Sequence, residues 1–290
     1  MLAFDLRDQS CSICRDALEQ ADCYFKRSYY EPNLQALSKT QRSKILPFGL
    51  NCCLETCGSR TLVAKLFLRN PACILRFRAT LRTYLRLANV KIMERPFSIE
   101  PEQIIHFQTR VWQPEEVVGD DFREINETRV ALVRSLRREF GARFKGGLVP
   151  TAFARVHYPD ALSPEPCVQS QHVKSSRAAL IGVYSRGLHH SLGFKLTEYL
   201  ASSKCIVAEP LRNSLPVPLV EGTHYRKFTA VEECLALCDQ LLANPRAARE
   251  MRAANWEYYS RYVRFDQLIP RCLNVCDLTA SKSLYQDRRG

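Results

Sequence analysis

The chain has 290 residues, 46% of them hydrophobic, and a formal net charge of +12. A chain of this length and apolar content can bury a core, which excludes an intrinsically disordered protein. The positive charge is compatible with nucleic acid, an anionic membrane or a phosphorylated ligand as the partner, and it does not choose among them.

The sequence shows neither a secretory signal nor a membrane span. Residues 1–10 mix acidic and basic side chains with scattered apolar ones, whereas a signal peptide needs an uninterrupted apolar segment. The most apolar later stretch, residues 66–87, is interrupted by arginines, namely Arg69, Arg76, Arg78, Arg82 and Arg86. A membrane span needs roughly 20 nearly uncharged residues, so we expect a soluble, cytoplasmic protein.

The 13 cysteines are an odd number, and several fall within predicted strands or helices. This usage is typical of free thiols in a reducing compartment. The alternative is a zinc site built from Cys11 and Cys14 with Cys53 and Cys57, because thiolates at close spacing can complete a tetrahedron. The second pair is irregularly spaced and lies in a predicted loop, so free thiols are the favoured interpretation.

The first hundred residues predict only part of a domain. Residues 21–26 and 44–50 have the pattern of two short strands. Two strands cannot form a complete doubly wound domain, so residues 1–65 are interpreted as the remnant of an N-terminal acceptor-side domain. Residues 71–88 predict a long helix inside a linking segment that covers residues 66–99.

From residue 100 onward, strand and helix patterns alternate, which indicates an α/β fold with a parallel sheet covered by helices. The predicted strands are 104–111, 143–149, 178–184, 205–209 and 224–228. The predicted helices are 126–140, 192–202, 231–243, 246–262 and 266–278. We therefore expect a Rossmann-like domain at residues 100–280, followed by a disordered tail at residues 281–290.

The most informative segment is residues 184–210, with the sequence YSRGLHHSLGFKLTEYLASSKCIVAEP. A strand ends at Tyr184, a loop follows, and Gly193 opens a helix that carries Lys195 and Glu198 about one turn apart. In an open parallel sheet, ligands bind where strand ends meet helix N-termini. The free amides there can hold a phosphate, Lys195 adds a positive charge, and Glu198 can accept hydrogen bonds from a ribose diol.

This segment resembles the C-terminal domain of GT-B glycosyltransferases of the glycosyl transferase group 1 type, especially the spore-maturation-protein-like branch. That family has a loop, a helix with a Glu, a small-residue turn and a strand, which is the layout of GFKLTEYLASSKCIVAEP. The resemblance continues through EGTHYRKFTAVEECLALCDQLLANPRAAREMRAANWEYYSRY and covers roughly residues 100–275. It implies a GT-B-like fold and transfer of a sugar from a nucleotide-diphosphate donor to an acceptor that the sequence does not identify.

The resemblance also implies roles for individual residues of a donor site. Glu198 matches the family's Glu that holds the nucleotide ribose. Lys195 and Arg110 match basic residues that face the donor diphosphate. The start of the helix, at Gly193 and Phe194, would present backbone amides to the same phosphates.

Two histidines precede this helix. Retaining members of the family often have a second Glu eight residues before the ribose-binding one, but His190 occupies that position here, so the stereochemical outcome is not predicted. We consider His189 a candidate donor contact and His190 a candidate catalytic proton donor, with a structural hydrogen-bonding role as the alternative for both. For Arg110 the alternative is an ion pair with Glu115 or Glu116.

No metal or other cofactor is expected, because Arg and Lys side chains can stabilise the charge on a leaving diphosphate. Asp120 and Asp121, in the loop GDDF, are interpreted as solvated turn residues and not as metal ligands. The expected partner is a nucleotide-sugar donor.

Two other functions remain open besides the glycosyltransferase, which ranks first. A catalytically inactive nucleotide-sugar-binding remnant would keep the donor pocket with a shortened N-terminal domain. A basic nucleic-acid-binding protein would use the arginine-rich helices, and its affinity would fall steeply with salt. This last function ranks lowest, because the chain has no helix-turn-helix, zinc-finger or aromatic RNA-binding motif.

Overall fold

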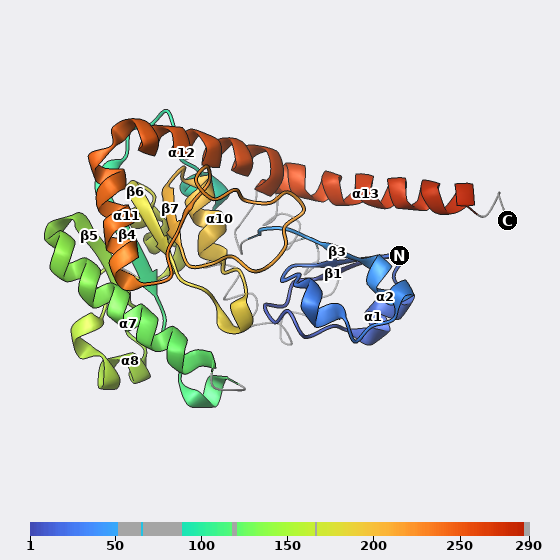
Figure 1. Cartoon of the computed structure of the whole chain (residues 1–290), viewed down its shortest axis with the longest axis horizontal. Helices are drawn as coiled ribbons and strands as arrows, with labels where there is room; N and C mark the ends of the chain where they lie inside the picture. Colours follow the sequence, from blue (N-terminus) through green and yellow to red (C-terminus); the bar gives the residue numbers. More distant parts are fainter. Residues whose placement is uncertain (52–64, 66–88, 118–120, 166, 287–290) are drawn as a thin grey trace.

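The computed structural model describes residues 1–51, 65, 89–117, 121–165 and 167–286. These residues contain two parallel β-sheets with accompanying helices, so the predicted α/β class with parallel sheets is confirmed. Figure 1 shows the smaller N-terminal sheet beside the larger sheet, with the last helix extending from the larger sheet past the smaller one. The predicted helix at residues 71–88 lies outside the described residues.

The N-terminal sheet has three parallel strands in the order β1-β2-β3. The strands are β1 (Leu2–Asp5), β2 (Cys23–Lys26) and β3 (Ile45–Pro47). The connecting helices are α1 (Arg15–Gln20) and α2 (Lys39–Lys44). Strands β2 and β3 fall within the two predicted strands. Strand β1 adds a third that the sequence does not predict, because its four residues are too few to reveal an alternation.

The larger sheet has five parallel strands in the order β5-β4-β6-β7-β8. The strands are β4 (Glu102–Thr109), β5 (Phe144–Leu148), β6 (Ala179–Tyr184), β7 (Cys205–Ala208) and β8 (Arg226–Lys227). Every residue of β6 and β7 is buried. Burial of whole strands is expected where helices cover both faces of a parallel sheet. All five correspond to predicted strands, with ends that differ by a few residues.

Helices surround the larger sheet (Figure 1). They are α6 (Val90–Met93), α7 (Asp121–Phe140), α8 (Ala152–His157), α9 (Gln169–Ser176), α10 (Phe194–Ala201), α11 (Val231–Ala243), α12 (Pro245–Tyr258) and α13 (Phe265–Gln286). Helix α11 has the predicted bounds. Asn244 caps α12 by accepting from the amide of Ala247, and Pro245 occupies the first turn, so the two helices are separated at this point.

Helix α10 is shorter than the predicted range 192–202 by two residues at its start and one at its end, and three other helices differ by more. Helix α7 begins at Asp121 and not at residue 126, with acidic side chains in the first turn that suit the positive end of the helix dipole. The predicted helix at residues 246–262 ends at Tyr258 and continues as a π-helical turn over Tyr259–Val263. Helix α13 extends to Gln286, beyond the predicted end at residue 278 and into the expected tail.

One glycine allows β5 to lie close to its neighbour β4. Gly146 has φ +129°, and a Cβ there would collide with the backbone carbonyl of Phe107 on β4. A side chain at this position is therefore excluded both by the backbone conformation and by the space. The close approach places the end of β5 next to the end of β4, where the functional site lies.

Helix α13 joins the two halves. Its residues Leu268 and Cys272 pack in one apolar cluster with Cys23, Phe25 and Phe48 of the N-terminal sheet. Figure 1 shows this helix, in red, passing from the larger sheet toward the smaller one. The described residues contain no helix with the length and apolar character needed to cross a bilayer.

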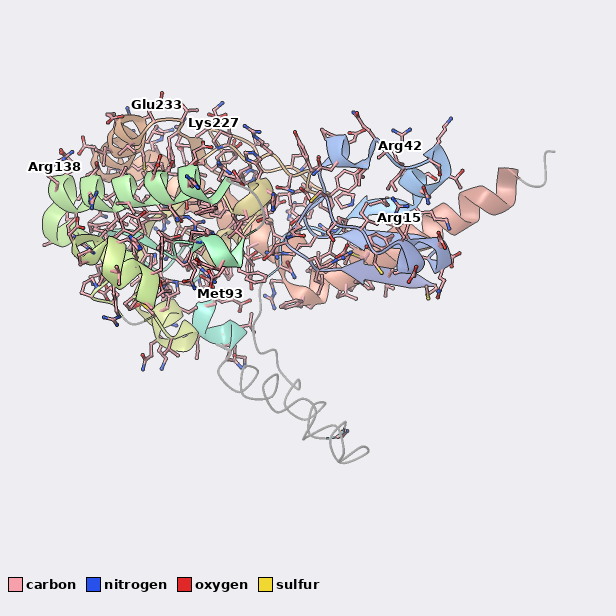
Figure 2. All side chains as sticks on the ribbon, turned by 90° about the horizontal axis from the view of Figure 1, so that it is seen from below. Arg15, Arg42, Met93, Arg138, Lys227 and Glu233 are labelled. Atoms are coloured by element: carbon pink, nitrogen blue, oxygen red, sulfur yellow. The ribbon has the colours of Figure 1, made fainter. Side chains whose placement is uncertain are left out.

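The positive charge is distributed over both halves. Figure 2 places Arg15 and Arg42 on the N-terminal helices and Arg138 at the far end of α7, and all three side chains are exposed. These arginines therefore lie on opposite ends of the molecule and form no shared surface.

Candidate functional site

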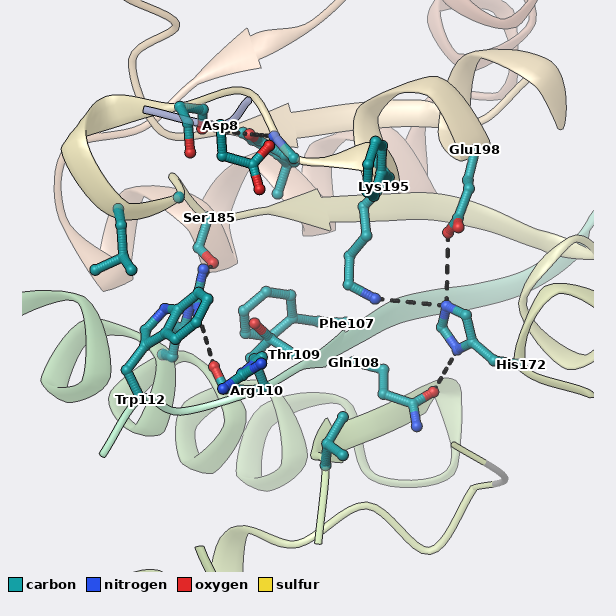
Figure 3. A pocket seen from close by; sticks show the side chains of 18 of the residues that line it. Asp8, Phe107, Gln108, Thr109, Arg110, Trp112, His172, Ser185, Lys195 and Glu198 are labelled. Carbon is teal, nitrogen blue, oxygen red and sulfur yellow. Dashed lines mark hydrogen bonds and ion pairs between the residues drawn. The ribbon is translucent and has the colours of Figure 1, made fainter. Parts of the chain in front are cut away.

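A cavity of about 530 Å³ lies at the carboxyl ends of β4 and β6, beside the start of α10 (Figure 3). Most of its lining comes from the larger sheet and its helices. The N-terminal half contributes Asp8, Gln9 and Arg27. The site thus lies where two segments distant in the sequence face each other, at the place where open parallel sheets bind ligands.

The start of α10 opens into this cavity. Gly193 is the N-cap residue and lacks a capping side chain, so the first amides of the helix have no side-chain acceptor. The amide of Gly193 itself donates to Oη of Tyr184 at 2.7 Å. Phe194 and Lys195 also line the cavity, and the guanidinium of Arg27 lies 4.1 Å from the ring centroid of Phe194. This combination of helix dipole and cations suits an anion.

Glu198 lies one turn further along α10 and is 8% exposed. Its Oε2 has no hydrogen-bond partner among the described residues, and Nε2 of His172 lies 3.7 Å from it. Burial acts to raise the pKa of Glu198, but His172 and Lys195 outweigh it, so the pKa is lowered. A buried, ionised carboxylate therefore lines the cavity, and its unpaired Oε2 lies toward His172.

A polar network surrounds this carboxylate (Figure 3). Nε2 of His172 lies 3.4 Å from Nζ of Lys195, and Nδ1 of His172 lies 2.5 Å from Oε1 of Gln108. The amide nitrogen of Gln108 donates to Sγ of Cys167 at 2.9 Å. Burial is the main cause that lowers the pKa of His172, so the imidazole is neutral at neutral pH.

Two arginines line the opposite part of the cavity. Arg110 forms an ion pair with Glu116 and lies 3.9 Å from the ring centroid of Trp112. The predicted alternative of an ion pair is thus present, and Arg110 lines the cavity as well. Arg129 is buried and donates to Oγ of Ser185, at 3.0 Å, and to two backbone carbonyls. Burial lowers the pKa of Arg129 to about 10.

No carboxylate lies within ion-pair distance of Arg129 in the part of the chain that the structure describes. The N–H groups of its guanidinium donate to neutral oxygens, and the guanidinium remains charged at neutral pH because its pKa is about 10. A buried guanidinium without an acidic partner is expensive unless an anion compensates it. Glu209 interacts with Arg129 electrostatically without direct ion-pair contact, so Arg129 adds a positive charge to the cavity wall that is compensated only in part.

The loop before α10 has an unusual backbone. His189 and His190 both have left-handed conformations, with φ +52° and +57°. The amide of His189 donates to Oδ2 of Asp121 at 2.8 Å, and Arg186 donates to Oδ1 of the same carboxylate at 2.6 Å. Asp121 therefore holds this loop, and its interpretation as a solvated turn residue is wrong.

The structure gathers the predicted donor-site residues around one cavity. Those that line it are Arg110, His189, Gly193, Phe194, Lys195 and Glu198. His190 is not among the lining residues, and its Nε2 lies 3.1 Å from the guanidinium of Arg212. Sequence reasoning missed His172 and Arg129, which reach the cavity from α9 and α7.

Eight cysteines of the described residues are free thiols, namely Cys11, Cys14, Cys23, Cys167, Cys205, Cys234, Cys238 and Cys272. In that part of the chain, no group of three or more His, Cys, Asp or Glu side chains converges as a metal site. Cys53 and Cys57, which belong to the alternative zinc site, lie outside the described residues.

Several solved structures have a similar course of the chain. One is the C-terminal domain of a glycosyl transferase group 1 family protein from Francisella tularensis, with 11% identity and a TM-score of 0.41 over 60% of this chain and 98% of that one. A glycosyltransferase from Rickettsia africae has 12% identity and a TM-score of 0.49, over 95% and 69%. The UDP-GlcNAc 2-epimerase from Neisseria meningitidis has 14% identity and a TM-score of 0.42, over 85% and 61%.

No protein-family model and no curated protein matches the sequence. With all three TM-scores below 0.5, the choice of a function depends on the chemistry of the cavity itself.

Proposed function

We propose that the chain is a glycosyltransferase whose cavity binds the nucleoside diphosphate part of a sugar donor. The observation that carries this proposal is the buried Glu198, whose Oε2 lacks a partner beside a cavity entered by a helix N-terminus. A buried acceptor left unpaired costs about 1–3 kcal/mol. Hydroxyl groups of a ribose are neutral donors of the right kind to bind such a carboxylate.

The phosphates of the donor would lie between the start of α10 and the cations of the cavity wall. Lys195 and Arg129 both line the cavity, and Arg129 donates its hydrogen bonds to neutral oxygens. Helix amides and cations together favour a dianionic group. The diphosphate would connect the ribose, held by Glu198, to the transferred sugar, which would lie further along the cavity.

This arrangement would assist the transfer of the sugar. As the bond between sugar and diphosphate lengthens, positive charge builds on the sugar ring and negative charge on the leaving phosphate. Fixed cations such as Arg129 and Lys195 stabilise that negative charge more in the transition state than in the ground state. The acceptor would approach from the N-terminal half, which contributes Asp8 and Arg27 to the same cavity.

The test is calorimetric titration with UDP, ADP and GDP, comparing the wild-type chain with Glu198→Ala. We expect one-site binding of at least one nucleotide and a loss of about 10-fold to 100-fold in the variant, because hydrogen bonds to charged groups contribute about 1.5–3 kcal/mol. Glu250→Ala, which removes an exposed carboxylate on α12, is the matched control and should bind normally. Failure of all three nucleotides to bind would reject the donor site.

Transfer is measured separately, as release of free nucleotide from the matching sugar nucleotide in the presence of a panel of sugar, lipid and protein acceptors. Release that depends on an acceptor supports the glycosyltransferase. Tight nucleotide binding without release would favour the alternative of a nucleotide-sugar-binding protein without activity.

A further inference from the structure

His172 lies at the centre of the polar network, and the proposed donor site does not by itself explain its position. The side chain is 7% exposed on α9. Figure 3 shows it between Lys195 and Glu198, with Gln108 on the other side of the ring. The two nitrogens of the imidazole therefore have different surroundings, and each can be assigned a hydrogen-bonding role.

Gln108 determines the tautomer of His172. The amide nitrogen of Gln108 donates to Sγ of Cys167, so Oε1 is the atom that faces the imidazole. A carbonyl oxygen only accepts hydrogen bonds, and Nδ1 of His172 must therefore carry the hydrogen. In neutral His172, Nε2 is then the nitrogen without a hydrogen.

Nε2 of His172 can serve only one of its two remaining neighbours at a time. Without a proton, it accepts from Nζ of Lys195, at 3.4 Å, and offers nothing to Glu198. With a proton, it donates to Oε2 of Glu198 and repels Lys195. The unpaired Oε2, at 3.7 Å, corresponds to the first of these two arrangements.

We propose that binding of the donor diphosphate draws Lys195 away from His172, and that His172 then takes up a proton from solvent at Nε2 and donates a hydrogen bond to Glu198. This inference rests on the proposed function, because it needs an anionic ligand at the start of α10. A phosphate is a stronger partner for an ammonium group than a neutral imidazole. Oε2 then accepts from His172, and the other lone pairs of the carboxylate remain for the hydroxyl groups of the ribose.

His172 is on this view a positioning residue. It fixes the ribose-binding carboxylate of Glu198 only after a diphosphate has engaged Lys195, so the two ends of the nucleotide bind cooperatively. The chain would thereby distinguish a nucleoside diphosphate from the corresponding nucleoside, although the ribose of either could fill the same end of the cavity.

The charged groups around His172 keep it neutral in the free protein. Burial is the largest cause that lowers the pKa of His172, and Lys195 and Lys204 lower it further. Glu198 acts in the opposite direction. Moving Lys195 toward a phosphate removes one repulsion and leaves the attraction of Glu198, so the pKa of His172 rises on binding.

Among the groups packed on α9, Lys204 also titrates near neutral pH. Its ammonium donates to the backbone carbonyl of Ser176, and burial lowers its pKa to about 7. His106 on β4 has its ring centroid 5.1 Å from that of His172, and burial holds its pKa well below the ordinary value. Helix α6 also contacts α9, and its charged residue Lys91 is exposed. His172 contacts both Lys195 and Glu198, so protonation on ligand binding is assigned to His172. Uptake that persists in His172→Gln would point to Lys204 instead.

The experiment measures the protons taken up on binding. The nucleoside diphosphate that binds most tightly among UDP, ADP and GDP is titrated calorimetrically at about pH 7 in buffers of different ionisation enthalpy. We expect the wild-type chain to take up a fraction of a proton, at most about one, because a single group titrates. The terminal phosphate has a pKa of about 6, and a cationic site favours its ionised form. Binding would therefore release protons from the phosphate to solvent, which is opposite in sign to the uptake expected for His172.

Two variants make the result specific. In His172→Gln, which keeps a hydrogen-bonding side chain without a titrating ring, the uptake should vanish. His157→Gln removes an exposed histidine of α8 and should keep the wild-type uptake. The corresponding nucleoside, which lacks the diphosphate, should bind the wild-type chain without proton uptake.

Equal uptake in wild type and His172→Gln, or no uptake in the wild type, would overturn the inference while leaving nucleotide binding and the effect of Glu198→Ala intact. Absence of nucleotide binding would instead reject the proposed function. If His172→Gln does not fold, ¹⁵N spectra of histidine-labelled wild type decide. Nε2 of His172 should change from unprotonated to protonated on addition of nucleotide, and an unchanged signal would contradict the proposal.

Discussion

Asp5 in the N-terminal half and Glu198 in the C-terminal half are both buried carboxylates near the carboxyl edge of a parallel sheet. Asp5 accepts hydrogen bonds from the side chains of Arg7, at 2.9 Å and 2.8 Å, and from Tyr24, at 2.6 Å. The ammonium of Lys26, which is fully buried, lies 3.1 Å away. Glu198 instead has an oxygen with no partner among the described residues.

The difference separates a carboxylate used for folding from one available to a ligand. The hydrogen bonds from Arg7 and Tyr24 outweigh the desolvation of Asp5 and hold its pKa well below the ordinary value. A fully satisfied network of this kind stabilises the fold. A buried carboxylate that is not satisfied costs stability, and is retained where a ligand completes it.

The largest effect on stability is expected for Asp5→Ala, which tests whether Asp5 is needed for folding. The variant leaves the ammonium of Lys26 buried without its carboxylate, so the free energy of unfolding should fall by about 3–5 kcal/mol. Urea unfolding measures it, with Asp16→Ala on α1, an exposed position, as the control. A loss below about 1 kcal/mol would show that the N-terminal network is not structural.

An intermediate effect is expected for the two buried arginines. Both arginines donate to backbone carbonyls, which for Arg252 are those of Ser203, Phe97 and Ile99. Arg129 lines the cavity and Arg252 does not. Arg129→Met should weaken nucleoside diphosphate binding by about tenfold, the effect of roughly one charged hydrogen bond. Arg252→Met should lower stability and leave affinity unchanged. Equal affinities in both variants would remove Arg129 from the donor site.

The smallest effect concerns acid stability. Because the folded-state pKa of Asp5 is lowered from 3.8, its contribution to stability is complete above that value and is lost as the pH falls below it. A single such group changes the free energy of unfolding by at most about 1.4 kcal/mol per pH unit. Unfolding of Asp5→Asn should therefore depend less on pH below 3.8 than unfolding of the wild type. Parallel pH profiles would contradict this assignment.

Local signals in the sequence predict much of the larger sheet and part of its site. Asn244 and Pro245 mark the boundary between α11 and α12, so both helices can be placed from chain chemistry alone. Part of the site comes from the first two turns of α10, which carry Gly193, Lys195 and Glu198. These residues are brought together by the helix itself, so the sequence can predict that they lie near one another.

The remaining site residues depend on tertiary structure. His172 lies in the helix QSQHVKSS, which has no apolar period, and it meets Glu198 only through the crossover that follows β5. Arg129 belongs to a helix rich in arginine, and charged residues on such a helix are usually exposed to solvent. The sequence therefore predicts an exposed side chain at this position. Its burial is decided by contacts with Ser185 and Arg186, which are distant in the sequence.

The packing of α13 on the N-terminal sheet has a consequence for synthesis of the chain. Phe25 and Phe48 leave the ribosome long before Leu268 and Cys272, the residues that cover them. At a translation rate of about 5–20 residues per second, the apolar face of the first sheet stays uncovered for on the order of ten seconds or more. The half of the protein that is made first is thus the half that is completed last.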